Sequence, residues 1–313
     1  MTDIFDTPWK DMLDRYFEDF MAFFFPEAHA DIDWSQPCES CDAELRKIVR
    51  DADLGKRLAD KLMRVVRRNG KAGFAMIHSE IQASRDYDLP ERTYIYNYRI
   101  YDRYHVPVAS FVILGDDNPK WRPDHFEYEI WGCRPALAFP VIKLLDYNDQ
   151  WPELETSANP FAMVVMAHLE TRATHGDPQG RLRSKIGLIR RLYQSGRDRQ
   201  QVLELFHFID WVLELPAELV EPFVDEVERL ETELKVSYVN TWERRGIEQG
   251  VRQGIEQGVK QGEAALLKSQ LVHRFDHLPA WAERRLADAS REELERWGKR
   301  VLDAKALDEV FAR

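Results

Sequence analysis

The residues with the clearest chemical potential lie in two stretches that have the pattern of neighbouring strands. Alternation along residues 74–82 places Glu80 and Gln82 side by side near a strand end, and Asp60 opens the partner strand. Two carboxylates and an amide oxygen form a hard oxygen site of the kind that Mg²⁺ prefers. Such a metal lowers the pKa of a bound water and neutralises charge on a phosphodiester. On spacing alone this pattern is weak evidence, because an acid two residues before a glutamine is also common among the ordinary polar side chains of a surface strand.

A hairpin would bring these side chains together. Residues 61–67 have the pattern of a strand, and Asn69-Gly70 after them is a strong reversal signal. The strands 61–67 and 74–82 are therefore predicted to pair antiparallel.

A helix and a buried strand should follow this hairpin. Asp88 and Glu91 match a capping box, which opens a helix that is predicted to run to about Tyr104. Residues 106–114 are nearly all apolar, which is typical of a strand buried on both faces. A hairpin, a helix and then a buried strand imply a crossover onto the same sheet. Residues 126–130 alternate and predict a further strand.

Other parts of the chain have helical spacing. Residues 9–25 predict one amphipathic helix that Pro26 ends. From residue 159 onward only helical patterns occur, with predicted helices at 160–169, 182–193, 200–213 and 217–241. Residues 246–262 repeat Gly and Gln every four residues, which fits either a self-association helix or a flexible tether. Helical patterning returns over 264–313.

Three motifs occur in order along the chain: Ala59-Asp60-Lys61-Leu62, then Ile77-His78-Ser79-Glu80-Ile81-Gln82-Ala83-Ser84, then Pro90-Glu91-Arg92 with Tyr96 and Tyr98. Together they resemble the PD-(D/E)xK nuclease superfamily, and within it the bacterial recombination-promoting nuclease and transposase branch. The resemblance covers about residues 5–150. It implies an α/β fold with a restriction-endonuclease-like core, a mixed sheet flanked by helices, before an all-helical C-terminal part. The stretch 266–311 resembles a small helical domain of unknown function.

The resemblance implies an Mg²⁺-dependent DNA endonuclease linked to recombination or a mobile element. Asp60 and Glu80 would bind the metal, and Gln82 would position water. Because Gln82 stands where the wider superfamily has lysine, the site lacks a cation, so activity would be slow or would be supported by a neighbouring base such as Lys61 or Arg92. Glu18 is a candidate third catalytic acid, since the superfamily often places one on the first helix; a solvated helix position is the alternative.

Charge is unevenly distributed. The net charge is −11, yet residues 56–72 and 181–199 are basic. We expect these islands to hold DNA phosphates, although a solvated surface is the alternative. The candidate DNA contacts are Lys61, Arg64, Arg67, Arg68, Arg92, Tyr96, Arg190 and Arg191.

Several other classes are disfavoured. Three cysteines do not suggest a disulfide framework, and Cys38-Glu39-Ser40-Cys41 lacks the further ligands of a structural zinc site. No apolar run is long enough to span a membrane and no leader is visible, so a cytoplasmic protein is expected.

The predicted organisation is a nuclease-like domain over 5–150, a helical extension packing on it over 151–241, a repeat helix or linker over 242–263 and a small helical domain over 264–313. A second hypothesis keeps the nuclease fold without catalysis. The chain would then be an interaction protein that forms a homo-oligomer through 246–262.

Overall fold

The computed structural model describes residues 6–43, 45, 60–80, 87–236, 291–301 and 307–311, together with single positions between 267 and 286. Of residues 60 and 77–80 it describes the backbone alone. The chain forms two compact units, Met1–Tyr238 and Val239–Arg313. The predicted domain 5–150 and its helical extension thus belong to one unit. The repeat at 246–262 lies outside the described residues.

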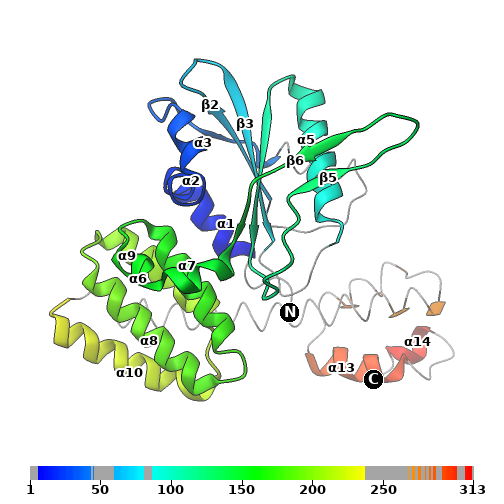
Figure 1. Ribbon diagram of the computed structural model, residues 1–313. Coiled ribbons are helices and arrows are strands. Elements are labelled where there is room, and N and C mark those ends of the chain that lie inside the picture. Colours follow the sequence, from blue (N-terminus) through cyan, green and yellow to red (C-terminus); the bar gives the residue numbers. More distant parts are fainter. Residues whose placement is uncertain are drawn as a thin grey trace. The chain divides into compact units, whose positions relative to one another are not determined.

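A five-stranded mixed sheet is the centre of the first unit (Figure 1). Its strand order is β1-β2-β3-β4-β7; the first two pairings are antiparallel and the last two are parallel. The bounds are β1 Glu39–Ser40, β2 Asp60–Val66, β3 Ala72–Glu80, β4 Val108–Leu114 and β7 Val141–Lys143. The α/β class and the mixed sheet are as predicted.

The β2–β3 hairpin confirms the prediction made from Asn69-Gly70. Gly70 has a φ of 75°, and its amide donates to the Arg67 carbonyl at 2.8 Å. Glycine adopts such a φ without the steric penalty of a Cβ atom, so the chain reverses here. The crossover is also confirmed: helix α5 (Leu89–Tyr104) connects β3 to the parallel strand β4, whose last five residues are buried.

The predicted capping box is not formed. Asp88 has helical backbone angles and its side chain makes no capping hydrogen bond. Pro90 in the first turn reduces the need for a cap, because proline has no amide hydrogen to satisfy.

The single helix predicted over residues 9–25 is wrong. Helix α1 (Asp6–Arg15) and helix α2 (Phe17–Phe24) are separated by Tyr16, whose φ and ψ are −125° and 39°. The Tyr16 hydroxyl and the Arg15 guanidinium both donate to Glu204, 188 and 189 residues away in sequence. Pro26 starts a third helix, α3 (Pro26–Asp31), because proline is well suited to the first helical position.

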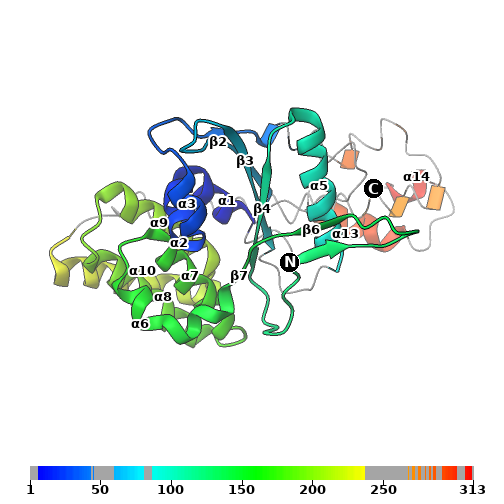
Figure 2. The same cartoon turned by 45° about the horizontal axis from the view of Figure 1, so that its top comes forward.

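Two helical layers cover the sheet (Figures 1 and 2). Helix α5 packs on one face, where Tyr96 and Ile100 join a cluster with Leu62 and Met76. Helices α1 to α3 lie on the other face, where the rings of Phe25 and Phe111 are 4.4 Å apart.

The four predicted long helices after residue 159 are confirmed, and they form a bundle. Their bounds are α7 Pro160–Ala173, α8 Pro178–Gln194, α9 Arg199–Val212 and α10 Ala217–Leu234; the 3-10 helix η1 (Leu144–Gln150) and α6 (Trp151–Thr156) precede them. Helix α10 ends earlier than predicted, at Lys235, whose φ is 55°. Trp9 of α1 packs on Phe161 and Phe208 with ring centroids 6.2 Å apart in both cases, so α1 shares a core with the bundle.

The predicted strand over 126–130 is shorter and belongs to a separate ribbon. Strand β5 (His125–Glu127) pairs antiparallel with β6 (Ala136–Ala138) and not with the main sheet.

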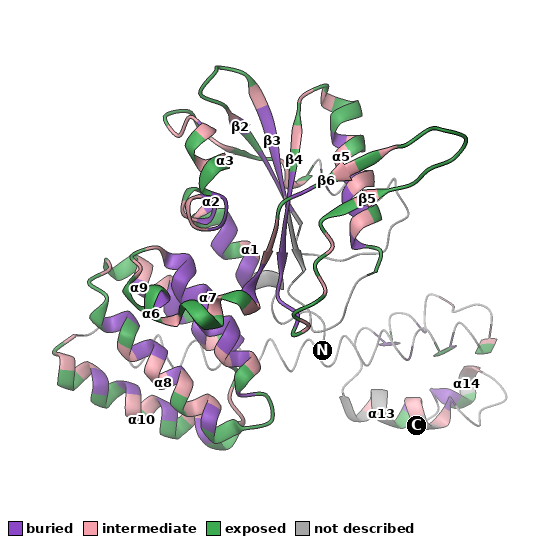
Figure 3. Ribbon diagram, viewed as in Figure 1, coloured by how far each residue is buried: buried purple, intermediate pink, exposed green. Residues whose placement is uncertain are grey.

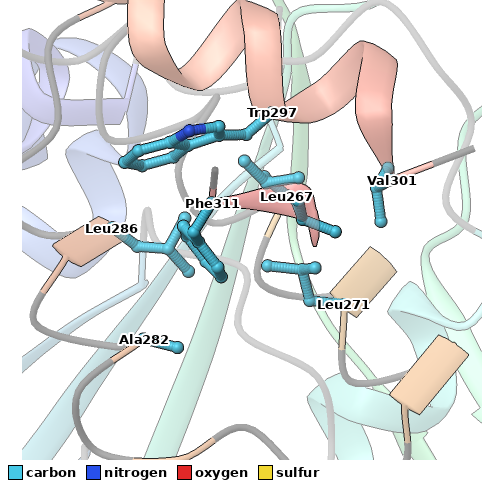
Figure 4. Close-up of a cluster of buried hydrophobic side chains, with 8 residues drawn as sticks. Leu267, Leu271, Ala282, Leu286, Trp297, Val301 and Phe311 are labelled. Atoms are coloured by element: carbon cyan, nitrogen blue, oxygen red, sulfur yellow. The ribbon is translucent and has the colours of Figure 1, made fainter. Parts of the chain in front are cut away.

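The second unit has a hydrophobic cluster of its own (Figure 4). This unit includes helices α13 (Arg291–Arg300) and α14 (Leu307–Val310). The rings of Trp297 and Phe311 meet edge to face, with their centroids 4.8 Å apart. Within the described ranges, no helix has both the length and the apolar character needed to cross a bilayer.

Candidate active site

The register of β2 and β3 determines how the predicted acids relate. Asp60 pairs with His78, and Glu80 follows two residues later on the same strand. Because side chains alternate along a strand, positions 60, 78 and 80 share one face of the sheet. This is the face that α5 covers. Leu62 follows Asp60 by two residues, so it is on the same face, and its side chain packs against Tyr96 and Ile100 of α5. Gln82 lies outside the described residues.

The same register continues across the parallel strands. Glu80 on β3 pairs with Leu114 on β4, and Leu114 pairs with Lys143 on β7. Strands lie about 4.8 Å apart, which puts the backbones of Glu80 and Lys143 about 10 Å apart in one row. The carboxyl ends of three parallel strands therefore meet at one edge, the usual place for ligand sites in α/β sheets.

A buried ion pair stands at this carboxyl edge. Lys143 Nζ donates to Asp116, and the two side chains are 0% and 1% exposed. Lys143 Nζ also lies 5.7 Å from the centre of the Trp121 ring and 3.4 Å from the Trp121 carbonyl oxygen. Burial lowers the pKa of Lys143, while the carboxylate of Asp116 acts in the opposite direction.

The loop 115–122 after β4 is held by further contacts. His168 Nε2 and Arg172 Nη1 of α7 each lie 3.0 Å from the Gly115 carbonyl oxygen. Arg172 also pairs with Asp117 at 3.0 Å, and Arg122 forms a two-pronged ion pair with Asp146 at 2.7 and 2.5 Å. Complete burial lowers the pKa of His168 to about 4, so this imidazole is neutral at pH 7.

Lys61 was predicted as a DNA contact and as a substitute for the missing cation; both predictions need correction. Its side chain is 1% exposed, and it binds Asp14 and, at 3.1 Å, Asp42. Alternation places it on the face opposite to Asp60. Burial, together with the nearby Lys10, lowers the pKa of Lys61 to about 8.

Two further predicted contacts lie in the interior. Tyr96 is 1% exposed in the core under α5, so it cannot stack on a base as it stands. Arg92 is 8% exposed on the same sheet-facing side of α5, one turn before Tyr96. The structure thus brings Arg92 and Tyr96 together, but in the core.

Glu18 lies apart from the predicted metal ligands. It is on α2, on the opposite side of the sheet from α5, and its side chain is 60% exposed with His29 Nε2 3.8 Å away. The structure does not bring Glu18 to the face that carries positions 60 and 80.

The remaining predicted DNA contacts are arginines that bind groups within the chain. Four of them pair with acids: Arg64 with Glu39 at 3.4 Å, Arg67 with Asp31 at 2.5 Å, Arg190 with Glu233 at 2.8 Å and Arg191 with Glu155 at 2.7 Å. Arg68 donates to the Ala30 carbonyl oxygen at 2.6 Å. Exposed ion pairs of this kind contribute only about 0–1 kcal/mol, so a phosphate can compete for these arginines.

Within the described residues, no group of three or more His, Cys, Asp and Glu side chains could hold a metal ion. Asp60 and Glu80 are not covered by this statement, because only their backbones are described. Cys38 and Cys41 are present as thiols, and burial raises the pKa of Cys38.

The comparisons with known proteins add no relative. No family model matches the chain, and neither a curated protein nor a solved structure matches it significantly.

Sequence reasoning missed the polar edge formed by Asp116, Lys143 and His168. The sequence predicted the buried strand over 106–114, and no site role was assigned to the acids that follow it. An acid two residues after an apolar strand was the available signal, because ligand sites in α/β sheets collect at that end.

Proposed function

We propose that the first unit is a metal-dependent phosphodiesterase that cleaves DNA internally. The observation that carries this proposal is the strand register, which puts Asp60 and Glu80 on adjacent strands, on one face, two positions apart. Diagonal neighbours in an antiparallel pair lie about 7–8 Å apart at their backbones, within the reach of two carboxylates on one cation.

The donor types fit a hard divalent cation. Asp60, Glu80 and Gln82 offer carboxylate and amide oxygens, the ligands typical of Mg²⁺. Asp60 and Glu80 would hold the ion, which would supply an activated water and charge neutralisation on the phosphate. The Gln82 amide would orient the water by hydrogen bonding.

The basic residues limit the expected rate. Lys61 is on the wrong face, and Lys143, although in the row of Glu80, is bound to Asp116 in the interior. Arg92 is on the sheet-facing side of α5 and is itself buried, at 8% exposure. An amide in place of the usual lysine leaves less positive charge near the reacting phosphate, so slow turnover is expected.

The test is cleavage of a supercoiled plasmid by the full chain with Mg²⁺, compared with EDTA. Glu80→Gln and Asp60→Asn should each reduce cleavage about 100-fold, because each removes one charged ligand while preserving shape. Glu221→Gln, at an exposed position of α10, is the matched control and should cleave normally. Equal cleavage by Glu80→Gln and the unaltered chain would refute the assignment. Absence of cleavage with any divalent metal would favour the non-catalytic interaction protein.

A further inference from the structure

Exposed apolar side chains concentrate in one part of the first unit. Among the described residues, seven large hydrophobic side chains are exposed, and only Trp211 on α9 lies elsewhere. The other six are on or just before α5 and on the β5–β6 ribbon: Tyr87, Tyr98, Tyr101, Tyr128, Ile130 and Trp131. Exposed apolar side chains that gather in one region mark interaction sites.

The ribbon has one apolar face. Phe126 pairs with Leu137, and the bridge between Ile130 and Cys133 continues the pairing toward the apex. The inner end of this face is covered, since the rings of Phe126 and Tyr94 of α5 are 5.1 Å apart. The outer end projects beyond α5, and there Tyr128 and Ile130 are 48% and 49% exposed (Figure 3).

The apex holds a tryptophan that the fold does not use. Trp131 and Gly132 have φ angles of 50° and 81°, the pattern of a two-residue turn that favours Asn-Gly. A left-handed conformation is unfavourable for tryptophan. Trp131 is 99% exposed, so packing within the unit does not offset this conformational cost. A strained residue without a folding benefit points to a role in recognition.

Helix α5 offers a complementary surface. Tyr94, Tyr98 and Tyr101 follow helical spacing on one side, and the last two are 56% and 50% exposed. The second half of α5 carries Arg99 and Arg103 against Asp102 alone. Across residues 124–138 the balance is reversed, with Asp124, Glu127 and Glu129 against Arg134.

We propose that the partner of this surface is a second copy of the same chain. The ribbon apex of each protomer would lie on the exposed tyrosines of α5 in the other protomer. Two-fold symmetry requires that this contact is made twice. One contact of this kind would cover both aromatic surfaces and would bring the acidic ribbon to the arginines of α5. The same acids disfavour a phosphate backbone as the partner of the ribbon.

The first test is the mass of the full chain in solution over a range of concentrations. The unaltered chain should form a dimer of twice 36.9 kDa. Trp131→Ser should raise the dimer dissociation constant about 30-fold or more, which is typical of a central aromatic contact. Trp211→Ser removes an exposed tryptophan from α9 and should leave the dimer unchanged. A chain that is monomeric at tens of micromolar, or a Trp131→Ser variant that dimerises normally, overturns the proposal.

The second test locates the contact. Cys133, beside the apex, is an exposed free thiol. In a Cys38→Ser, Cys41→Ser background treated with oxidised glutathione as the oxidant, Tyr101→Cys should form a reducible covalent dimer with Cys133 of the other copy, whereas Glu221→Cys on α10 should not. A bridge formed only within one chain, or no bridge, contradicts the arrangement. If the unaltered chain and Trp131→Ser are both monomeric, and the substitution weakens binding to a DNA duplex, the ribbon is a nucleic-acid contact and the dimer is excluded.

Discussion

Two lysines are buried in the same sheet, but the acids that bind them differ. Lys61 on β2 pairs with Asp14 and Asp42, whose side chains are 46% and 14% exposed. Lys143 on β7 pairs with Asp116, which is 1% exposed. A carboxylate that reaches water stays partly hydrated when its lysine is lost, whereas a sealed one does not. The exposure of the acid, more than that of the lysine, should therefore decide what each pair contributes to stability.

The largest effect should come from breaking the sealed pair. Lys143→Met leaves Asp116 charged and buried without its lysine, so we expect the free energy of unfolding to fall by about 3–5 kcal/mol. Urea denaturation followed by circular dichroism measures this. The double variant Lys143→Met, Asp116→Leu removes both charges and should recover most of the loss. A double variant as unstable as the single one would show that packing, and not the unpaired charge, is responsible.

A slightly smaller effect should come from lowering the pH, which acts on His168 at the same edge of the sheet. His168, bound to the Gly115 carbonyl oxygen, has a pKa of about 4 in the fold against an ordinary 6.5. Below pH 6.5 the unfolded chain takes up a proton that the folded chain does not, so stability falls until the pH passes about 4. The loss amounts to about 3 kcal/mol.

Urea midpoints at pH 7 and pH 4.5 test this effect. His168→Gln keeps a side-chain donor for the Gly115 carbonyl and should show a smaller decrease between the two pH values than the unaltered chain. Parallel curves would mean that other groups cause the acid sensitivity.

The smallest effect should come from the pair that touches water. Lys61→Met leaves two carboxylates that solvent can reach, and we expect a loss of about 1–2 kcal/mol in the free energy of unfolding. The same urea experiment compares it with Lys143→Met. If Lys61→Met is as harmful as Lys143→Met, the exposure of the acid does not govern these pairs.

Local signals predicted the hairpin, the crossover and the bundle well. Asn69-Gly70 fixes the reversal through backbone preference alone, and the apolar run that became β4 needs no partner to be recognised. The register itself did not follow from these signals, because a shift of one residue would reverse the faces; the observed pairing of Asp60 with His78 puts positions 60 and 80 on one face.

Features that depend on distant partners could not be predicted. The break at Tyr16 depends on Glu204, and the burial of Lys61 depends on Asp14 and Asp42. The basic island around Arg190 looked like a free positive surface because its acid, Glu233, is 43 residues away. Charge counted along a sequence does not show which charges meet in space.

The anchoring of loop 115–122 has a consequence for any ligand at the carboxyl edge. Loops at this end of an α/β sheet often order or close around what they bind. Here Lys143, Asp146, His168 and Arg172 already hold the loop, so binding would require little additional loss of conformational entropy. The loop is therefore a fixed wall rather than a lid, and a substrate must fit its existing shape.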